Sequence, residues 1–546
     1  MNGYPKLPIP LNEPVKNYAP GSAERAAILA AIEDASTNPV DVPIVIGGKA
    51  VYTDEKIEIQ CPHNHTLSLG VYSSATAEHA KQAIAAALKA RSAWQDMPWE
   101  ARAAIFLKAA DLAAGPWRQR LNAATVLGQG KTVYQAEIDS ACEWVDFLRF
   151  NADFARQIYS EQPVSSPEVW NQVEYRPLDG FVFAVTPFNF TAIAGNLPAA
   201  AALMGNTVVW KPSERSVLSA HVIMELFYEA GLPDGVINFL PTADPAAVGD
   251  VVLNNEHMAG IHFTGSTRTF QMMWRKVAEN NGHYKSYPRL VGETGGKDFV
   301  FAHSSAAPQA LVTGLIRGAF EYQGQKCSAA SRAYIPASLW DEVTQGLKEQ
   351  VAGVAVGPPT DLRNFVGAVI DRRAFDEIGA YIDFARQDPG HEILVGGERN
   401  DKEGFFIKPT VVIASDPRSK LMTEEIFGPV LTLYKYEDDE LESALDVVDQ
   451  SCDYALTGAI FARDRAVINH LANRLRHSAG NFYINDKPTG AVVGQQPFGG
   501  GRKSGTNDKA GSALNLIRWC SARTIKETMV SATDYRYPFM QEESKD

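Results

Sequence analysis

Phe181-Val-Phe-Ala-Val-Thr186 opens a series of short runs that are rich in β-branched and aromatic residues. Thr207–Lys211 and Val236–Leu240 continue the series, and Ser216–Ala230 between them has helical spacing. Strands that alternate with helices are typical of a parallel α/β sheet. A second alternating block runs from Phe299 to about Ile460. The sequence therefore predicts two α/β regions.

The segments outside these blocks have other patterns. Val42–Val51 and Ile57–Ile59 alternate around Gly47-Gly48, which predicts a hairpin. Ile517–Tyr537 is predicted to be a β-rich tail. Four segments with small and apolar residues at helical spacing make the first part of the chain mostly helical: Ala26–Ile32, Glu78–Trp94, Ala101–Ala114 and Asp139–Ile158.

Length and composition limit the class of protein. A chain of 546 residues exceeds what one hydrophobic core supports, so several domains are expected. The net charge of −13 argues against nucleic acid and anionic membranes as partners, because both attract clustered Lys and Arg. No run approaches the ~18 apolar residues of a membrane-spanning helix. The five cysteines, an odd number spread thinly, favour free thiols in a reducing compartment.

The first twenty residues, Met1–Pro20, resemble neither a secretory signal nor a transit peptide. A cytoplasmic bacterial protein, or the processed form of a mitochondrial matrix protein, is therefore expected.

Cys327 is the first candidate for chemistry, within Glu321-Tyr-Gln-Gly-Gln-Lys-Cys-Ser-Ala-Ala330. A thiol reacts as its thiolate, and the adjoining Lys326, backbone N–H groups or a helix N-terminus would lower its pKa. A cysteine among small residues is also commonly buried and unreactive. The case for a nucleophile depends on the groups that accompany it.

Two polar residues qualify as partners of such a nucleophile. The Asn189 amide follows a predicted strand and can donate to an oxyanion, although asparagine in a turn often caps its own backbone. Glu293 stands among glycines in Val291-Gly-Glu-Thr-Gly-Gly-Lys297. Such a carboxylate can act as a general base, or simply lie in a solvated loop.

Two further segments are typical of a nucleotide site. Gly265-Ser266-Thr267 separates an apolar run from a predicted helix at Arg268–Glu279, so backbone N–H groups at a helix N-terminus can face a pyrophosphate. The three-glycine dinucleotide fingerprint is missing, and a plain strand-to-helix turn is an alternative. Lys211 and Glu214 follow another strand and can bind ribose hydroxyls. A carboxylate there disfavours a 2′-phosphate, so NAD is favoured over NADP.

Together and in this order, these motifs resemble the aldehyde dehydrogenase superfamily over nearly the whole chain, with Glu424-Glu-Ile-Phe-Gly-Pro-Val430 as a further match. Four segments are similar to the branch that oxidises glutamate γ-semialdehyde, formed from Δ1-pyrroline-5-carboxylate in proline catabolism. These are Gly324–Ser328, Gly480–Lys487, Val493–Gly500 and Gly505–Lys509. The length leaves no room for a fused proline dehydrogenase module, so the monofunctional form is expected.

The resemblance implies an aldehyde dehydrogenase-like α/β fold with two parallel-sheet domains and a small β element for oligomerisation. The predicted division is an N-terminal helical part of the NAD-binding domain at 1–160, an oligomerisation hairpin at 161–180, the remaining NAD-binding domain at 181–294, a catalytic domain at 295–512 and an oligomerisation tail at 513–546. The resemblance also implies a homodimer, which can assemble further.

The resemblance also implies roles in catalysis. Cys327 attacks the aldehyde, Asn189 and the Cys327 N–H hold the oxyanion, and Glu293 activates water against the thioester. Hydride leaves the thiohemiacetal for NAD. The implied cofactor contacts are Thr186, Phe188, Lys211, Ser213, Glu214, Gly265, Ser266, Glu425 and Phe427.

Substrate recognition is implied for seven residues that surround the carboxylate, ammonium and aliphatic stem. They are Glu143, Phe190, Lys326, Ser328, Gly490, Ala491 and Phe498. The chain departs from the pattern twice. Many relatives have serine at Ala491, so one hydroxyl donor is missing here. Phe270 replaces the usual glycine of the superfamily, as it does in this branch, and is expected to occupy an otherwise open approach to the pyrophosphate.

Three alternatives stay open. The chain can act on another aldehyde, such as succinic semialdehyde, can be a cysteine hydrolase with a histidine partner, or can be an inactive binding relative. Cys61-Pro-His-Asn-His65 suggests a metal site, but no second ligand cluster follows it, so no metal is expected.

Overall fold

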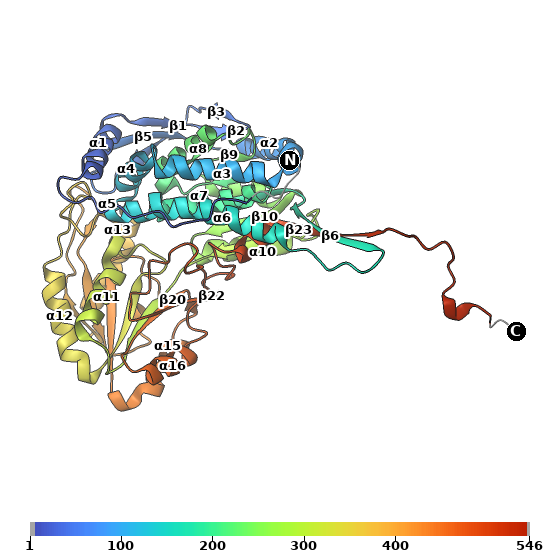
Figure 1. Cartoon of the computed structure of the whole chain (residues 1–546). Helices are drawn as coiled ribbons and strands as arrows, with labels where there is room; N and C mark the ends of the chain where they lie inside the picture. Colours follow the sequence, from blue (N-terminus) through green and yellow to red (C-terminus); the bar gives the residue numbers. More distant parts are fainter. Residues whose placement is uncertain (1–5, 543–546) are drawn as a thin grey trace.

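Two seven-stranded sheets form the centre of the computed structural model, which describes residues 6–542 (Figure 1). Five neighbouring strands of the first sheet are parallel, and an antiparallel hairpin closes one edge. The predicted parallel α/β sheet is confirmed. In order across this sheet, the strands are β11 (Arg289–Glu293), β10 (Met258–Thr264), β7 (Phe181–Val185), β8 (Thr207–Lys211), β9 (Ile237–Phe239), β2 (Ile44–Ile46) and β3 (Lys49–Val51).

Helices cover both faces of the first sheet. Val182 and Ala184 of β7 belong to one core, whereas Phe181, Phe183 and Val185 belong to the other, as the alternation of a strand requires. The helices on the first face are α1 (Ala23–Thr37), α3 (Trp99–Ala114), α4 (Arg118–Gln129), α6 (Trp144–Ser160), α7 (Thr191–Leu203) and α8 (Val217–Ala230). Those on the second face are α2 (Ala77–Asp96), α9 (Pro245–Leu253) and α10 (Thr267–Glu279).

The second sheet is parallel except at β14, which runs antiparallel at one edge. Its strands, in order, are β14 (His391–Val395), β17 (Thr410–Ala414), β18 (Val430–Tyr436), β13 (Ala330–Pro336), β12 (Asp298–Ala302), β20 (Thr457–Phe461) and β21 (Asn481–Ile484). The helices packed with it are α11 (Pro308–Phe320), α12 (Trp340–Ala352), α13 (Arg372–Gln387), α15 (Leu441–Gln450) and α16 (Arg465–Arg474).

The N-terminal strands correct one prediction. Only β2 and β3 form the hairpin around Gly47-Gly48. The strands β1 (Val40–Val42) and β4 (Lys56–Gln60) instead flank β5 (Ser68–Ser73) in a separate three-stranded sheet. The prediction was wrong because β5 supplies a partner strand that the pattern of Val42–Val51 and Ile57–Ile59 does not contain.

The helix predicted at Asp139–Ile158 is divided in two. A π-helix spans Glu137–Glu143 and continues directly into α6. A π-helix inserts an extra residue into a turn and is frequent at functional sites. Here it carries Glu143, one of the expected substrate residues.

A two-stranded ribbon projects from the body of the molecule (Figure 1). It pairs β6 (Val169–Pro177) antiparallel with β23 (Cys520–Thr528). The segment 161–180 thus contributes one strand that pairs with the tail, not a hairpin of its own. The β-rich prediction for the tail is wrong beyond Thr528, because residues 529–542 contain no strand and only a short 3₁₀ turn at Pro538–Met540. The predicted domain division also includes residues 1–5 and 543–546, which lie outside the described residues.

Within residues 6–542, no helix combines the length and the apolar character that crossing a membrane requires.

Candidate active site

The candidate site lies where the two sheets meet. Glu293 ends β11, and Asn189 lies between β7 and α7. Cys327 comes from the other half, just before β13. Among the contacts that join the halves, Asn189 Nδ2 donates to the Gln325 carbonyl oxygen at 3.1 Å, and Glu293 forms a β-bridge with Gly505. The structure therefore brings the three expected catalytic residues to one junction.

The backbone before Cys327 has an unusual path. Tyr322 and Gln323 have φ values of 53° and 56°, in the left-handed region that non-glycine residues rarely adopt. Gln323 holds this path in place, because its Nε2 donates to the carbonyl oxygens of Gly130 (3.0 Å) and Ala368 (2.7 Å). Such strain persists only where the surroundings over-determine the backbone. The position of the half-buried Cys327 is thus set by contacts with distant segments.

The electrostatics of Cys327 contradict one expectation. Burial raises the pKa of the Cys327 thiol well above its usual range, and the carboxyl groups of Asp298, Glu293 and Glu425 raise it further. Lys326 does not offset this, because its Nζ is paired with the Glu321 carboxylate at 3.4 Å. Burial also lowers the pKa of Lys326 itself. Lys326 is thus not among the groups that lower the pKa of the Cys327 thiol, contrary to the prediction.

Glu293 is half-buried at the end of β11. Burial raises its pKa well above the usual range, although Lys509 acts in the opposite direction. Its Oε2 atom is buried and has no hydrogen-bond partner among residues 6–542. A buried carboxyl oxygen without a partner is costly unless it serves a purpose. Accepting a proton from a water molecule is a chemical role that fits this atom.

Side chains from the helical part of the chain fix the backbone on both sides of Asn189. Gln129 Nε2 donates to the Phe188 carbonyl oxygen at 2.6 Å, and the Asp139 carboxylate accepts from the backbone N–H groups of Thr191 (2.9 Å) and Ala192 (2.8 Å). The Asn189 amide has two N–H bonds, and one points to Gln325. The other is available to an oxyanion in a fixed orientation, as preorganised stabilisation of charge requires.

The expected cofactor residues line the ends of β7, β8 and β10. Thr186 Oγ1 accepts from Trp210 Nε1 at 3.0 Å, and Lys211 Nζ lies 3.4 Å from Glu214 Oε2. Ser266 caps α10, since its Oγ accepts from the Thr269 N–H, and it follows Gly265 in the same turn. Ser213 caps a short 3₁₀ turn in the same way.

Glu425 and Phe427 approach from the second half of the molecule. Glu425 Oε1 accepts from the Gly296 N–H at 2.9 Å, and burial raises the pKa of Glu425 to about 7. Phe427 has a φ of 56°, and its ring meets Phe188 edge-on at 5.8 Å. Carboxylates at Glu214 and Glu425, hydroxyl groups and a helix N-terminus form a donor set that fits NAD.

Phe270 does not occupy the approach to the cofactor turn. Its ring stacks on Phe263 at 5.4 Å and fills the space that Gly292 leaves by having no side chain. Only 7% of Phe270 is exposed. The expectation of a blocked approach was wrong because the ring points into the core between β10 and β11.

Two segments bring the expected substrate residues together. Ser328 Oγ lies 2.8 Å from Thr489 Oγ1, so the residue after the nucleophile contacts the loop that carries Gly490 and Ala491. Gly490 has a φ of 94°, a conformation that favours glycine. Phe498 is bridged to Ala510 further along the same stretch of chain.

Glu143 and Phe190 border a buried ion pair. Lys131 Nζ lies 2.7 Å from Asp139 Oδ2 and 4.2 Å from the centre of the Phe190 ring. Burial, together with the Asp139 carboxylate, raises the pKa of Glu143 to about 8. The sequence did not point to Lys131, Asp139 or Gln129 as parts of the site. For Asp139, the available signal was a charged residue at the start of a predicted helix, but such residues usually face solvent.

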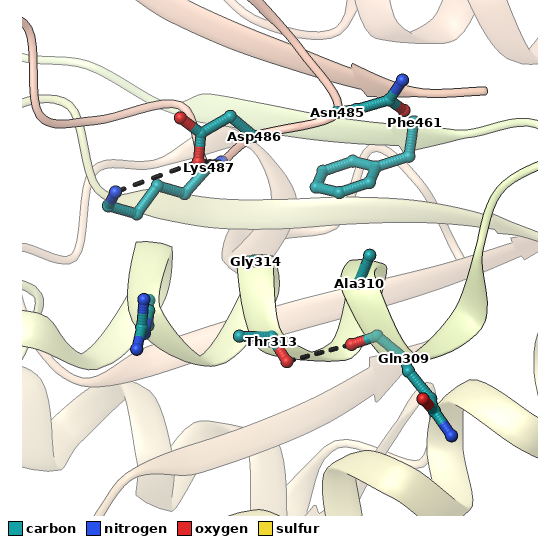
Figure 2. A pocket seen from close by; sticks show the side chains of 9 residues that line it. Gln309, Ala310, Thr313, Gly314, Phe461, Asn485, Asp486 and Lys487 are labelled. Carbon is teal, nitrogen blue, oxygen red and sulfur yellow. Dashed lines mark hydrogen bonds and ion pairs between the residues drawn. The ribbon is translucent and has the colours of Figure 1, made fainter. Parts of the chain in front are cut away.

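A cavity lies away from this site. It has a volume of about 350 Å³ and is bordered by α11 and by the segment after β21 (Figure 2). Its lining includes Thr313, Asn485 and Lys487, and none of the expected catalytic or cofactor residues. Among residues 6–542, no group of three or more His, Cys, Asp or Glu side chains is placed to hold a metal ion.

This chain belongs to the aldehyde dehydrogenase family, whose family model matches residues 51–525. The predicted resemblance is therefore confirmed. Among curated relatives, the probable delta-1-pyrroline-5-carboxylate dehydrogenase of Schizosaccharomyces pombe is 49% identical over 539 residues and covers 98% of each chain. The mitochondrial delta-1-pyrroline-5-carboxylate dehydrogenase of Dictyostelium discoideum is 50% identical and covers 98% of this chain and 96% of its own.

Solved structures agree with this result. The delta-pyrroline-5-carboxylate dehydrogenase of Mycobacterium tuberculosis bound with NAD is 54% identical, with a TM-score of 0.96 over 99% of this chain and all of that one. The 1-pyrroline-5-carboxylate dehydrogenase of Thermus with bound NAD is 32% identical, with a TM-score of 0.89 over 97% and 100% of the two chains. The aldehyde dehydrogenase fold is thus established.

Proposed function

We propose that this chain is an NAD-dependent dehydrogenase that oxidises L-glutamate γ-semialdehyde, formed from Δ1-pyrroline-5-carboxylate, to L-glutamate in proline catabolism. The observation that carries the proposal is the convergence of Asn189 and Glu293 on the segment of Cys327. The near full-length similarity to dehydrogenases of this substrate, two of them bound with NAD, supports the choice of aldehyde and cofactor.

Three residues carry the chemistry in this proposal. The Cys327 sulfur attacks the aldehyde carbon, and the oxyanion accepts hydrogen bonds from the Asn189 amide and the Cys327 N–H. NAD supplies the hydride acceptor. Glu293 takes a proton from the water that hydrolyses the thioester at Cys327, and glutamate leaves. The unpartnered Oε2 of Glu293 supports its role as the base.

Cofactor binding is assigned to the ends of the first sheet and to one loop of the second. Glu214 with Lys211, and Glu425, are suited to bind the hydroxyl groups of the two riboses, and the N-terminus of α10 is suited to face the pyrophosphate. The proposed contacts are Thr186, Phe188, Lys211, Ser213, Glu214, Gly265, Ser266, Glu425 and Phe427.

The amino-acid head of the substrate, which is its α-carboxylate and α-ammonium group, is assigned to two sides of the site. Ser328, Gly490 and Ala491 bind the α-carboxylate, with Lys326 as a nearby cation. Glu143 faces the α-ammonium, and Phe190 and Phe498 enclose the stem. The hydrogen bond between Ser328 and Thr489 supports the first assignment, because it holds the loop against the segment of the nucleophile.

We also propose a homodimer that uses the β6–β23 ribbon. The ribbon consists of two edge strands that project from the body of the molecule, and edge strands favour a partner strand. We also propose the predicted boundary between the NAD-binding and catalytic domains, at residues 294 and 295, because β11 ends at Glu293 and β12 begins at Asp298. Gel filtration that finds only a monomer would contradict the dimer.

One assay tests the proposed function. The protein, NAD and Δ1-pyrroline-5-carboxylate are expected to form NADH, and the Cys327→Ala variant is expected to form none above background. Succinic semialdehyde serves as the competing substrate. Equal activity in wild type and variant would remove Cys327 as the nucleophile, and a higher kcat/KM for succinic semialdehyde would overturn the substrate.

A further inference from the structure

An N-terminal arm, residues 6–22, precedes α1 and contains no helix or strand. Buried charges fasten it to the helices beneath. The Glu13 carboxylate lies 2.5 Å from Arg118 Nη1 and 2.9 Å from Arg149 Nη1. Glu137, in the π-helix, accepts from the Lys16 N–H at 2.9 Å and from the Tyr18 hydroxyl at 2.6 Å. The arm is therefore fixed on α4, the π-helix and α6.

Asn12 lies on this arm and makes three hydrogen bonds to two different elements. Its Nδ2 donates to Asp146 Oδ2 at 2.8 Å and to the Val493 carbonyl oxygen at 2.8 Å. Its Oδ1 accepts from Gln495 Nε2 at 2.9 Å. Both N–H bonds and the oxygen of the amide are thus engaged, which fixes its orientation. The adjoining Glu13 N–H also donates to Asp146, at 2.7 Å.

Asn12 joins two elements that are far apart in the sequence, and each of them adjoins residues expected to bind the substrate. Asp146 is in α6, one helical turn after Glu143. Val493 and Gln495 follow Gly490 and Ala491 in a loop, residues 488–500, that contains no helix or strand. A loop of this kind keeps its position through specific contacts, because no ladder of backbone hydrogen bonds fixes it.

We propose that Asn12 is a positioning residue for recognition of the amino-acid head of the substrate. Under the proposed function, Glu143 faces the α-ammonium and the Gly490 loop binds the α-carboxylate. Asn12 sets the separation of these two groups, because it bonds to α6, which continues directly from the π-helix that carries Glu143, and to the loop that carries Gly490. It does not touch the reacting atoms.

The test compares two aldehydes of equal length. Glutamate γ-semialdehyde carries the amino-acid head, and pentanal does not. Asn12→Ala is expected to raise KM for the semialdehyde about tenfold and to leave kcat, and both constants for pentanal, within about twofold, because the lost hydrogen bonds position only the head. The inhibition constant of L-glutamate, which has the same head, is expected to rise in parallel.

Two further variants keep the test decisive. Gln495→Ala removes one of the three hydrogen bonds and is expected to raise KM for the semialdehyde about threefold. Asn17→Ala is the matched control, since this asparagine lies on the same arm and its side chain accepts, among residues 6–542, only from the nearby Ala19 N–H. It is expected to behave as wild type. Thermal unfolding shows whether each variant is folded. If Asn12→Ala does not fold, the KM of Gln495→Ala for the semialdehyde tests the proposal instead.

The results separate two kinds of failure. Equal losses with both aldehydes, or an unchanged KM in Asn12→Ala and Gln495→Ala, would overturn the role of Asn12 alone. A wild-type protein that does not oxidise the semialdehyde with NAD would overturn the proposed function instead.

Discussion

The reacting centre and the loop at 488–500 are held in different ways. At the reacting centre, buried side chains bond to distant segments: Gln323 fixes the backbone before Cys327, and Asp139 fixes the backbone after Asn189. The loop has exposed residues and depends on a few side-chain bonds, among them those of Asn12 and Ser328. This difference implies that the chemistry and the choice of aldehyde are separable, and that changes in each region affect different kinetic constants.

Replacing the base at the reacting centre is expected to have the largest effect. Glu293→Gln removes the carboxylate that activates water and is expected to lower steady-state kcat by about 10²–10⁴-fold. The first turnover of NADH persists, since attack and hydride transfer precede hydrolysis. Stopped-flow NADH formation measures both phases. Full steady-state turnover in this variant would contradict the role of Glu293.

Removing the side-chain donor to the oxyanion is expected to lower kcat slightly less than Glu293→Gln does. Asn189→Ala deletes the side-chain amide and is expected to lower kcat by about 10²–10³-fold, as loss of one such donor does elsewhere. The loss must appear in the first turnover, because the oxyanion forms before hydride leaves. The variant also loses the bond to Gln325, so thermal unfolding is the control. A normal first turnover followed by slow hydrolysis would contradict the assignment.

The pH dependence of the first turnover reports the state of Cys327. Burial and neighbouring carboxyl groups raise the pKa of the thiol, so the thiolate fraction, and with it the burst rate, is expected to rise about tenfold per pH unit below that pKa. Glu293 is one of the groups that raise it. Glu293→Gln is therefore expected to shift the burst profile to lower pH, as rapid mixing across pH can measure. A shift to higher pH would mean that Glu293 is the base for the thiol.

The sequence predicted the catalytic residues better than the residues that hold them in position. Cys327, Glu293 and Asn189 stand in motifs whose order and spacing are visible along the chain, and the strands before them have clear patterns. Gln129 and Asp139 were not predicted, because their bonds to the Asn189 loop link residues more than fifty positions apart and depend on how the helices pack.

The sequence also could not predict the direction in which some side chains point. Lys326 adjoins Cys327 in the sequence, yet it pairs with Glu321 across a turn whose left-handed residues only the structure reveals. Phe270 was expected near the cofactor, but the absence of a side chain at Gly292 lets its ring enter the core. Adjacency in sequence is thus a poor guide to electrostatic contact where the backbone turns sharply.

Adding a hydroxyl group to the loop is expected to give the smallest effect. It tests directly whether the choice of aldehyde can be changed without changing the chemistry. Ala491→Ser adds one donor near the expected carboxylate site. One neutral hydrogen bond contributes about 0.5–1.5 kcal/mol, which corresponds to a decrease in KM for glutamate γ-semialdehyde of about two- to tenfold. Pentanal lacks the carboxylate, so its KM and kcat are expected to stay unchanged. A change with both aldehydes would mean that the loop and the reacting centre are coupled, because residue 491 then affects steps that do not involve the carboxylate.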